Sequence, residues 1–206
     1  MNKILNEDLM DIIEQPVNWE KLANKTVMVT GASGMIGSYF VRTLLKLNEV
    51  RNMNIRVVCV ARNINKIGED ILTDSAAEVL SHDVTRPFEY ESNIDYIIHA
   101  ASPASPLIMK DSPVETIAAN VLGTYYTLEL AKEKNAEGYM FISSREIYGQ
   151  PDEGQEFFTE ETYGFVDPLN PRSCYPEGKK AAETMCASFK EEYGLNTKSA
   201  RLAHTY

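Results

Sequence analysis

The stretch KTVMVTGASGMIGSYF, residues 25–40, decides the fold. Its first six residues form a short apolar run that predicts a buried strand, and residues 36–48 have the pattern of a helix. Glycines between strand and helix permit a tight turn, close approach of a phosphate to the backbone, and close helix–strand packing. This order predicts a dinucleotide pyrophosphate site, with a purely structural turn as the alternative. The residues expected to contact the dinucleotide here are Gly31, Ser33, Gly34, Met35, Ile36 and Gly37.

Beyond this stretch, short apolar runs alternate with helical segments. Such runs, each separated by a helix, predict a parallel sheet that is buried on both faces, which is an α/β doubly wound sheet or Rossmann fold. Residues 1–24 predict a helical extension that covers the sheet edge, and residues 25–206 predict the NAD(P)-binding domain. The expected strands are 25–30, 55–61, 76–83, 94–101, 138–144 and 196–203. The expected helices are 36–48, 113–134 and the segment after Tyr175.

Composition excludes several classes of partner. The chain has 206 residues and a net charge of −10, which disfavours nucleic acid and anionic membranes. Its three cysteines, Cys59, Cys174 and Cys186, lack metal-ligand spacing, so we expect free thiols and no metal site. The acidic N-terminal segment does not have the pattern of a signal peptide, and no apolar run reaches transmembrane length. From these patterns we expect a soluble cytoplasmic protein.

The end of the second expected strand bears on which dinucleotide binds. A carboxylate there would hydrogen-bond the adenosine ribose of NAD, whereas the sequence reads VARN and places Arg62 and Asn63 at this point. An arginine suits a 2′-phosphate, so NADP is an alternative to NAD. Stacking of Arg62 on adenine, or exposure to solvent, is the competing interpretation. Asp83 ends the third strand and is expected near adenine with its neighbour Val84, with a turn-forming aspartate as the alternative.

Candidate proton-transfer residues occur in two later segments. FISSREIYG, residues 141–149, places Ser144 and Glu146 at the end of the fifth strand. Tyr175 and Lys179 are four apart and share one face of the following helix. Ser144 would hold a substrate oxygen while Tyr175 exchanges a proton with it, and the charge of Lys179 is expected to lower the pKa of Tyr175. The ordered set favours a proton-handling pair over two packing partners.

These motifs resemble the extended short-chain dehydrogenase/reductase family over residues 25–206. Within it they are most similar to the nucleotide-sugar epimerases, dehydratases and decarboxylases, above all the UDP-glucuronate decarboxylases. The further segments that carry the resemblance are HAASPASP (99–106), NVLGT (120–124) and NPRSCYPEGKKAAETMC (170–186). The resemblance implies a nucleotide-sugar substrate, a 4-keto intermediate and a recycled nicotinamide cofactor. A dTDP-glucose 4,6-dehydratase, a UDP-sugar 4-epimerase and a non-catalytic dinucleotide-binding module are the alternatives.

The resemblance also implies roles for individual residues. Tyr175 would be the base, assisted by Ser144 and Lys179, and Glu146 would lie near C5 of the sugar, with a solvated glutamate as the alternative. A homodimer would form through the helices that carry Asn120 and Tyr175. Asn120 would lie beside the site, although a helix-packing asparagine would have the same pattern. The residues expected to line the cofactor are Ala100, Ala101, Ser102, Asn120, Tyr175 and Lys179.

Four positions depart from the family pattern. Arg62 replaces the aspartate of the decarboxylases, and Arg145 replaces a small residue or the dehydratase aspartate. Arg145 would bind a substrate carboxylate or pair with Glu146. His204 replaces an asparagine that touches the nucleotide sugar. The chain ends at Tyr206, where the family continues into a smaller substrate domain, so a truncated substrate domain is expected.

Overall fold

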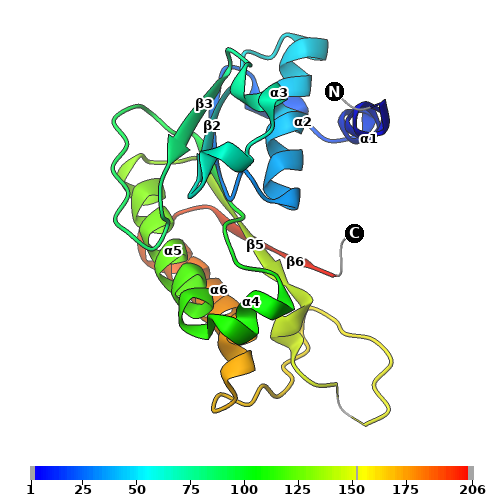
Figure 1. Ribbon diagram of the computed structural model, residues 1–206, viewed down its shortest axis with the longest axis vertical. Coiled ribbons are helices and arrows are strands. Elements are labelled where there is room, and N and C mark those ends of the chain that lie inside the picture. The colour runs from blue at the N-terminus through cyan, green and yellow to red at the C-terminus, as the bar shows by residue number, and fades with distance from the viewer. Residues whose placement is uncertain (1–2, 152, 204–206) are drawn as a thin grey trace.

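The computed structural model describes residues 3–151 and 153–203 and contains a six-stranded, entirely parallel sheet in the order β3-β2-β1-β4-β5-β6 (Figure 1). The doubly wound Rossmann fold predicted from the sequence is confirmed. The strands are β1 (Thr26–Thr30), β2 (Arg56–Ala61), β3 (Ala77–Ser81), β4 (Tyr96–His99), β5 (Gly138–Ser144) and β6 (Thr197–Leu202). The helices are α1 (Lys3–Glu14), α2 (Met35–Arg51), α3 (Glu69–Leu72), α4 (Pro106–Asp111), α5 (Pro113–Glu133) and α6 (Cys174–Tyr193). Single 3₁₀ turns are η1 (Trp19–Leu22), η2 (Ile64–Lys66), η3 (Arg145–Tyr148) and η4 (Pro171–Ser173).

The sheet separates two hydrophobic cores, because successive residues of each central strand point to opposite faces. In β1, Val27 and Val29 pack with α2, whereas Met28 packs in the cluster that contains residues of α5 and α6. Figure 1 shows α2 and α3 on one side of the sheet and α4, α5 and α6 on the other. Burial on both faces explains why the central strands read as continuous apolar runs.

The expectation of a helix between every pair of strands is wrong at one crossover, from β3 to β4, and only a short helix meets it from β2 to β3. Only η2 and the single turn α3 connect β2 to β3, and residues 82–95, between β3 and β4, contain no helix. That segment is polar and includes Pro87, which cannot continue a helix. Its buried Phe88 and Ile94 nevertheless attach it to the core on the α5–α6 side.

The N-terminal helix α1 packs against α2 and not against the sheet edge, which corrects the expectation for this segment. Leu9 and Ile13 are fully buried, and the Tyr39 hydroxyl of α2 donates to Asp8 at 2.8 Å. Ile13 and Met10 of α1 join the hydrophobic cluster that contains Val41, Leu44 and Leu47 of α2. All three cysteines are free and buried, and within the described ranges no helix has the length and apolar character needed to cross a bilayer.

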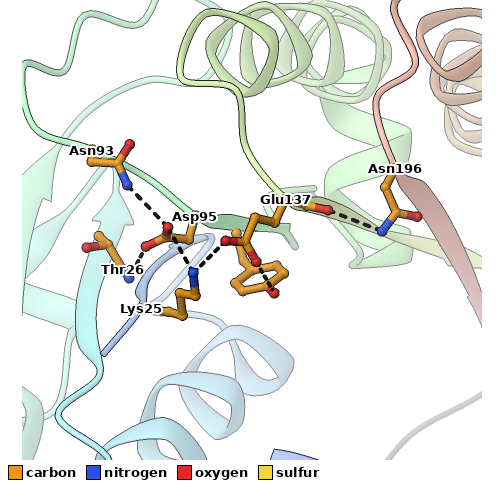
Figure 2. A network of polar contacts seen from close by, with 7 residues as sticks. Lys25, Thr26, Asn93, Asp95, Glu137 and Asn196 are labelled. Carbon is orange, nitrogen blue, oxygen red and sulfur yellow. Dashed lines mark hydrogen bonds and ion pairs between the residues drawn. The ribbon is translucent and has the colours of Figure 1, made fainter. Parts of the chain in front are cut away.

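The amino ends of the strands are joined by a polar network (Figure 2). Lys25 forms ion pairs with Glu137 and, at 3.7 Å, with Asp95. The other Asp95 oxygen accepts the amide of Thr26 at 2.7 Å, and the Tyr96 hydroxyl donates to Glu137 at 2.7 Å. These contacts connect the starts of β1, β4 and β5, and the polar groups involved have their hydrogen-bond and ion-pair partners within the network. Ligand-binding groups are therefore to be sought at the opposite, carboxyl edge.

Candidate functional site

The glycine turn after β1 is shaped by a close backbone contact. Gly31 has a φ of +70°, and a Cβ at this position would lie 2.8 Å from the carbonyl carbon of Ala100, which follows β4. The turn lies where the chain order across the sheet reverses, between β1 and β4. Gly34 precedes α2 without a side-chain cap, so the first amides of α2 face the turn. Gly37 instead packs α2 onto the turn, because a Cβ there would overlap the Gly31 carbonyl.

A cavity of about 660 Å³ opens at the carboxyl edge beside this turn. Its volume is in the range of pockets that hold cofactors. Most residues that the sequence assigned to the dinucleotide are in its wall. They are Gly31, Ser33, Gly34, Arg62, Asn63, Asp83, Val84, Ala100, Ala101 and Ser102. Lys66, on the same wall, was not anticipated, although its spacing of four residues from Arg62 is visible in the sequence.

Asp83 is both a turn residue and a pocket residue, so its two interpretations are compatible. Its Oδ1 accepts the amide of Thr85 at 3.0 Å and the Thr85 hydroxyl at 2.9 Å. Burial raises the pKa of Asp83, but the Thr85 hydrogen bonds and the charges of Arg62 and Arg86 outweigh it and lower that pKa overall. Asp83 therefore presents a carboxylate to the cavity at neutral pH.

A second cavity of about 240 Å³ adjoins the first and contains the proposed proton-transfer residues. Ala100, Ser102 and Ala104 line both cavities, so the two form one continuous region around the end of β4. The other predicted residues in the smaller cavity are Met35, Ile36, Ser144, Glu146, Tyr175 and Lys179.

Tyr175 and Lys179 are both buried on α6, and Lys179 faces β5. The Lys179 Nζ donates to the carbonyl of Ile142 at 2.7 Å and lies 5.6 Å from the centre of the Tyr175 ring. Burial lowers the pKa of Lys179 to about 7. Burial also raises the pKa of Tyr175, and a hydrogen bond with Ser144 only partly opposes this. The expectation that Lys179 lowers the pKa of Tyr175 is wrong here, because desolvation dominates and the ammonium group is bonded to Ile142.

Ser144 and Glu146 are held by the turn η3 that follows β5. The Ser144 Oγ accepts the amide of Glu146 at 3.2 Å and so caps this turn. The Glu146 carboxylate forms an ion pair with the Arg172 guanidinium at 3.0 Å. Sequence reasoning missed Arg172, although its place in NPRSCY, three residues before Tyr175, was visible. The departure at His204 lies outside the described residues.

Asn120 and Gly37 are the two predicted site residues that line neither cavity. Asn120 is buried on α5, its Nδ2 donates to the carbonyl of Thr116 at 2.9 Å, and its Cβ would lie 3.0 Å from a Cβ at Gly178 of α6. The structure thus places Asn120 in the contact between α5 and α6, in agreement with its helix-packing interpretation. Dimer formation through these helices stays a prediction.

A buried pair behind the turns was not anticipated. The Thr30 Oγ1 lies 2.7 Å from the Nδ1 of His99 and accepts the amide of Ala101 at 3.3 Å. Burial lowers the pKa of His99 to about 3, with a further contribution from the charge of Lys179, so the imidazole is neutral. The pair joins the ends of β1 and β4 and fixes the backbone that lines both cavities.

The site fits a dinucleotide on three structural grounds. Gly31 leaves room that any side chain would fill, and the start of α2 presents uncapped amides, which suit a pyrophosphate. The Oγ atoms of Ser102 and Ser143 are buried and have no hydrogen-bond partner among the described residues. Buried polar groups are normally hydrogen-bonded, and a bound polar ligand in the adjoining cavities would supply these partners.

Comparison with known proteins agrees with this geometry. The model of the NAD dependent epimerase/dehydratase family matches residues 27–206. UDP-glucuronic acid decarboxylase 6 of Arabidopsis thaliana is 38% identical over 188 residues, covering 89% of this chain and 52% of that protein. The chain spans about half the length of the curated relatives it matches.

Solved structures show the same fold. A UDP-galactose 4-epimerase has a TM-score of 0.70 at 25% identity, covering 85% of this chain and 55% of the other. The UDP-glucuronic acid 4-epimerase of Bacillus cereus, solved in complex with NAD, has a TM-score of 0.67 at 21% identity over 88% of this chain and 57% of the other. The second likeness is one of fold alone.

Proposed function

The chain belongs to the NAD-dependent epimerase/dehydratase family, and from this premise we propose that it binds a nicotinamide dinucleotide and modifies a nucleotide sugar. The sharpest form of the proposal is decarboxylation of UDP-glucuronate. The observation that carries it is the continuity of the two cavities through Ala100 and Ser102, with Tyr175 in the smaller one. A cofactor in the larger cavity and a sugar in the smaller one would meet at this point.

The chain's own groups would hold the dinucleotide along the carboxyl edge. The amides that follow Gly34 would bind the pyrophosphate, and the Ala100–Ser102 segment would line the path toward Tyr175. When bound, the nicotinamide supplies a hydride acceptor that is restored at the end of the cycle. The Thr30–His99 pair keeps this wall in place through the amide of Ala101.

Tyr175 would take the proton of a sugar hydroxyl while Ser144 hydrogen-bonds the same oxygen. Because burial raises the pKa of Tyr175, the phenolate needs a nearby positive charge. Lys179 can supply it when its ammonium group turns from the carbonyl of Ile142 toward the ring, 5.6 Å away. Oxidation at C4 makes a C5 carboxylate β to a ketone, so carbon dioxide leaves as its bonding electrons pass to the ketone oxygen.

Glu146 and Arg172 would control the charge beside the sugar carboxylate. Glu146 lines the smaller cavity, and its carboxylate is paired there with the Arg172 guanidinium. The positive charge of Arg172 also lowers the pKa of Tyr175 and so favours its phenolate. Arg172 is 42% exposed at its side chain, so it can exchange Glu146 for a carboxylate on the substrate. A substrate without that carboxylate would leave the pair intact.

The alternative within the class is dehydration or epimerisation of a nucleotide sugar. It shares the first oxidation and is favoured by the structural likeness to a UDP-galactose 4-epimerase. A different alternative is a dinucleotide-binding module without turnover. The presence of Ser144, Tyr175 and Lys179 in one cavity favours an enzyme over such a module.

The test is turnover of UDP-glucuronate, UDP-glucose and dTDP-glucose by the protein supplied with NAD or NADP, read by mass spectrometry. We expect loss of one carbon dioxide from UDP-glucuronate, abolition of turnover in Tyr175→Phe, and retained dinucleotide binding in that variant. Tyr163→Phe is the matched control, since Tyr163 is 88% exposed and lines neither cavity. Dinucleotide binding without conversion of any of the three sugars would replace the enzyme proposal by the binding module.

A further inference from the structure

We infer that the larger cavity selects a dinucleotide with a phosphate on the adenosine 2′-oxygen, and that Arg62 and Lys66 make this selection. The inference rests on the proposed function, because it assumes that the cavity holds a dinucleotide. It names the chemistry that distinguishes NADP from NAD at this site. Three observations carry it.

The first observation is position. β2 lies beside β1, and the amide of Ala32 in the glycine turn donates to the carbonyl of Val60 at 3.1 Å. Arg62 therefore comes two residues after Val60, the residue of β2 whose carbonyl accepts a hydrogen bond from the expected pyrophosphate-binding turn. In a Rossmann fold this is where the adenosine ribose lies. Both Arg62 and Lys66 line the cavity at this end.

The second observation is the local fold that brings Lys66 back to the cavity. The Asn63 Oδ1 accepts the amide of Asn65 at 3.0 Å and caps the turn η2. This turn ends at Lys66, so a cation four residues after Arg62 returns to the same wall. The segment from Arg62 to Lys66 contains no acidic residue that could accept a hydrogen bond from a ribose diol.

The third observation is that both cations are available. Within residues 3–151 and 153–203, neither Arg62 nor Lys66 forms an ion pair within 4.0 Å. Arg56, at the other end of the same strand, is paired with Glu78. The charge of Arg56, at the start of β2, is thus neutralised by Glu78. Arg62, just after the end of β2, lines the cavity and can bind an anionic group there.

Two carboxylates also line the cavity and define the competing outcome. Asp83 accepts both hydrogen bonds of Thr85 through Oδ1, and Glu115 is on α5. A ribose diol bound by Asp83 would favour NAD. A phosphate carries close to two negative charges, and its charge-assisted bonds to two cations outweigh the repulsion from the two carboxylates. The charges of Arg62 and Arg86 already act on Asp83 and lower its pKa.

The experiment is isothermal titration calorimetry of the 206-residue protein with NADP and with NAD at low and moderate salt. The variants are Arg62→Gln, Lys66→Gln and Arg62→Lys, and Arg56→Gln is the control on the same strand. We expect NADP to bind about tenfold or more tightly than NAD, with a steeper loss of affinity on adding salt. The preference should fall to about twofold in the two glutamine variants through a loss of NADP affinity that exceeds any loss of NAD affinity, and Arg62→Lys should retain part of the preference.

Each other outcome contradicts the inference in a distinguishable way. Equal binding of the two dinucleotides, or tighter NAD binding, overturns the phosphate selection and leaves the proposed function in place. An equal loss of NAD and NADP affinity in Arg62→Gln assigns Arg62 to stacking on adenine instead. Binding of neither dinucleotide by folded protein, with circular dichroism confirming the fold, overturns both the selection and the dinucleotide site.

Discussion

The two edges of the same parallel sheet treat their polar groups in opposite ways. At the amino edge, Lys25, Asp95 and Glu137 pair with one another and connect three strands (Figure 2). At the carboxyl edge, the Oγ atoms of Ser102 and Ser143 are buried without a partner in the described part of the chain. Polar groups that a protein leaves unpaired in its interior are costly, so the two serine hydroxyls, which both line the cavities at this edge, are available to a bound polar ligand.

The two arginines at the ends of β2 show the same difference between a paired amino edge and a carboxyl edge that faces a cavity. Arg56 opens β2 in an ion pair with Glu78, whereas Arg62 follows β2 on a cavity wall that also contains Lys66. Parallel strands place all their carboxyl ends on one side, so the groups that follow them converge there. The amino edge therefore stabilises the scaffold, and the carboxyl edge brings together the residues of the proposed site.

The largest effect is expected from Gly31→Ala at the carboxyl edge. A methyl group there would lie 2.8 Å from the Ala100 carbonyl and would occupy a φ of +70°. We expect a loss of about 3 kcal/mol in the free energy of unfolding and a loss of about tenfold or more in dinucleotide affinity. Urea denaturation and calorimetric titration measure the two quantities.

Gly194→Ala is the matched control for this change. Gly194 ends α6 with the same φ of +70°, but a Cβ there would meet no atom within 4 Å. Backbone strain alone should cost about 1 kcal/mol and leave dinucleotide affinity unchanged. Equal effects of the two variants would show that the contact with Ala100 does not shape the site.

The second prediction concerns Lys179, a buried cation that the carboxyl edge keeps at a cost in stability. Its pKa in the folded protein is about 7, below its ordinary value, so the unfolded chain binds more protons between pH 7 and 10. We therefore expect stability to rise from pH 7 to 8, because above this range the raised pKa values of the buried Cys59 and Cys186 thiols act in the opposite sense. Lys179→Met should remove this slope and raise the free energy of unfolding at pH 6 by ~3 kcal/mol, after subtracting the lost bond to Ile142.

Lys180→Met controls for the loss of a lysine from the same helix turn. The Lys180 side chain is 33% exposed, so the variant should keep the slope between pH 7 and 8. The free energy of unfolding of wild type and both variants, measured by urea denaturation at pH 6, 7 and 8, gives the slopes. A slope that persists in Lys179→Met would place the titrating group elsewhere.

The parts of the fold that could be predicted are those set by local pattern. Residues 138–144 were predicted as a strand and form β5 with these bounds, because their apolar run is buried on both faces. Residues 82–95 were misjudged, because the strand–helix alternation was extended over a polar segment that contains Pro87. The place of α1 could not be predicted, since an apolar stripe does not say which surface it will cover.

In the candidate site too, the residues that could be predicted are those set by local sequence spacing, and the features that were missed depend on the folded structure. Ser144, Tyr175 and Lys179 were found because motif spacing places them at a strand end and on one helix face. The contact between Thr30 and His99 was missed because 69 residues separate them in the sequence. The direction of the pKa shift of Tyr175 was also missed, since it depends on burial that no spacing reveals.

The smallest effect is expected at the amino edge, from Glu137→Gln. Hydrogen bonds from Lys25 and Tyr96 lower the pKa of Glu137, so its contribution to stability is present at neutral pH and is lost as pH falls through that lowered pKa. The stability difference between wild type and variant should be small at pH 7, because solvent screens an exposed pair, and should vanish in acid. Glu133→Gln, with a 65% exposed carboxylate paired to the adjacent Lys134, is the control. Because the network lies at the far edge from the cavities, dinucleotide affinity should not change. A loss of affinity in Glu137→Gln would mean that the two edges are coupled through the strands.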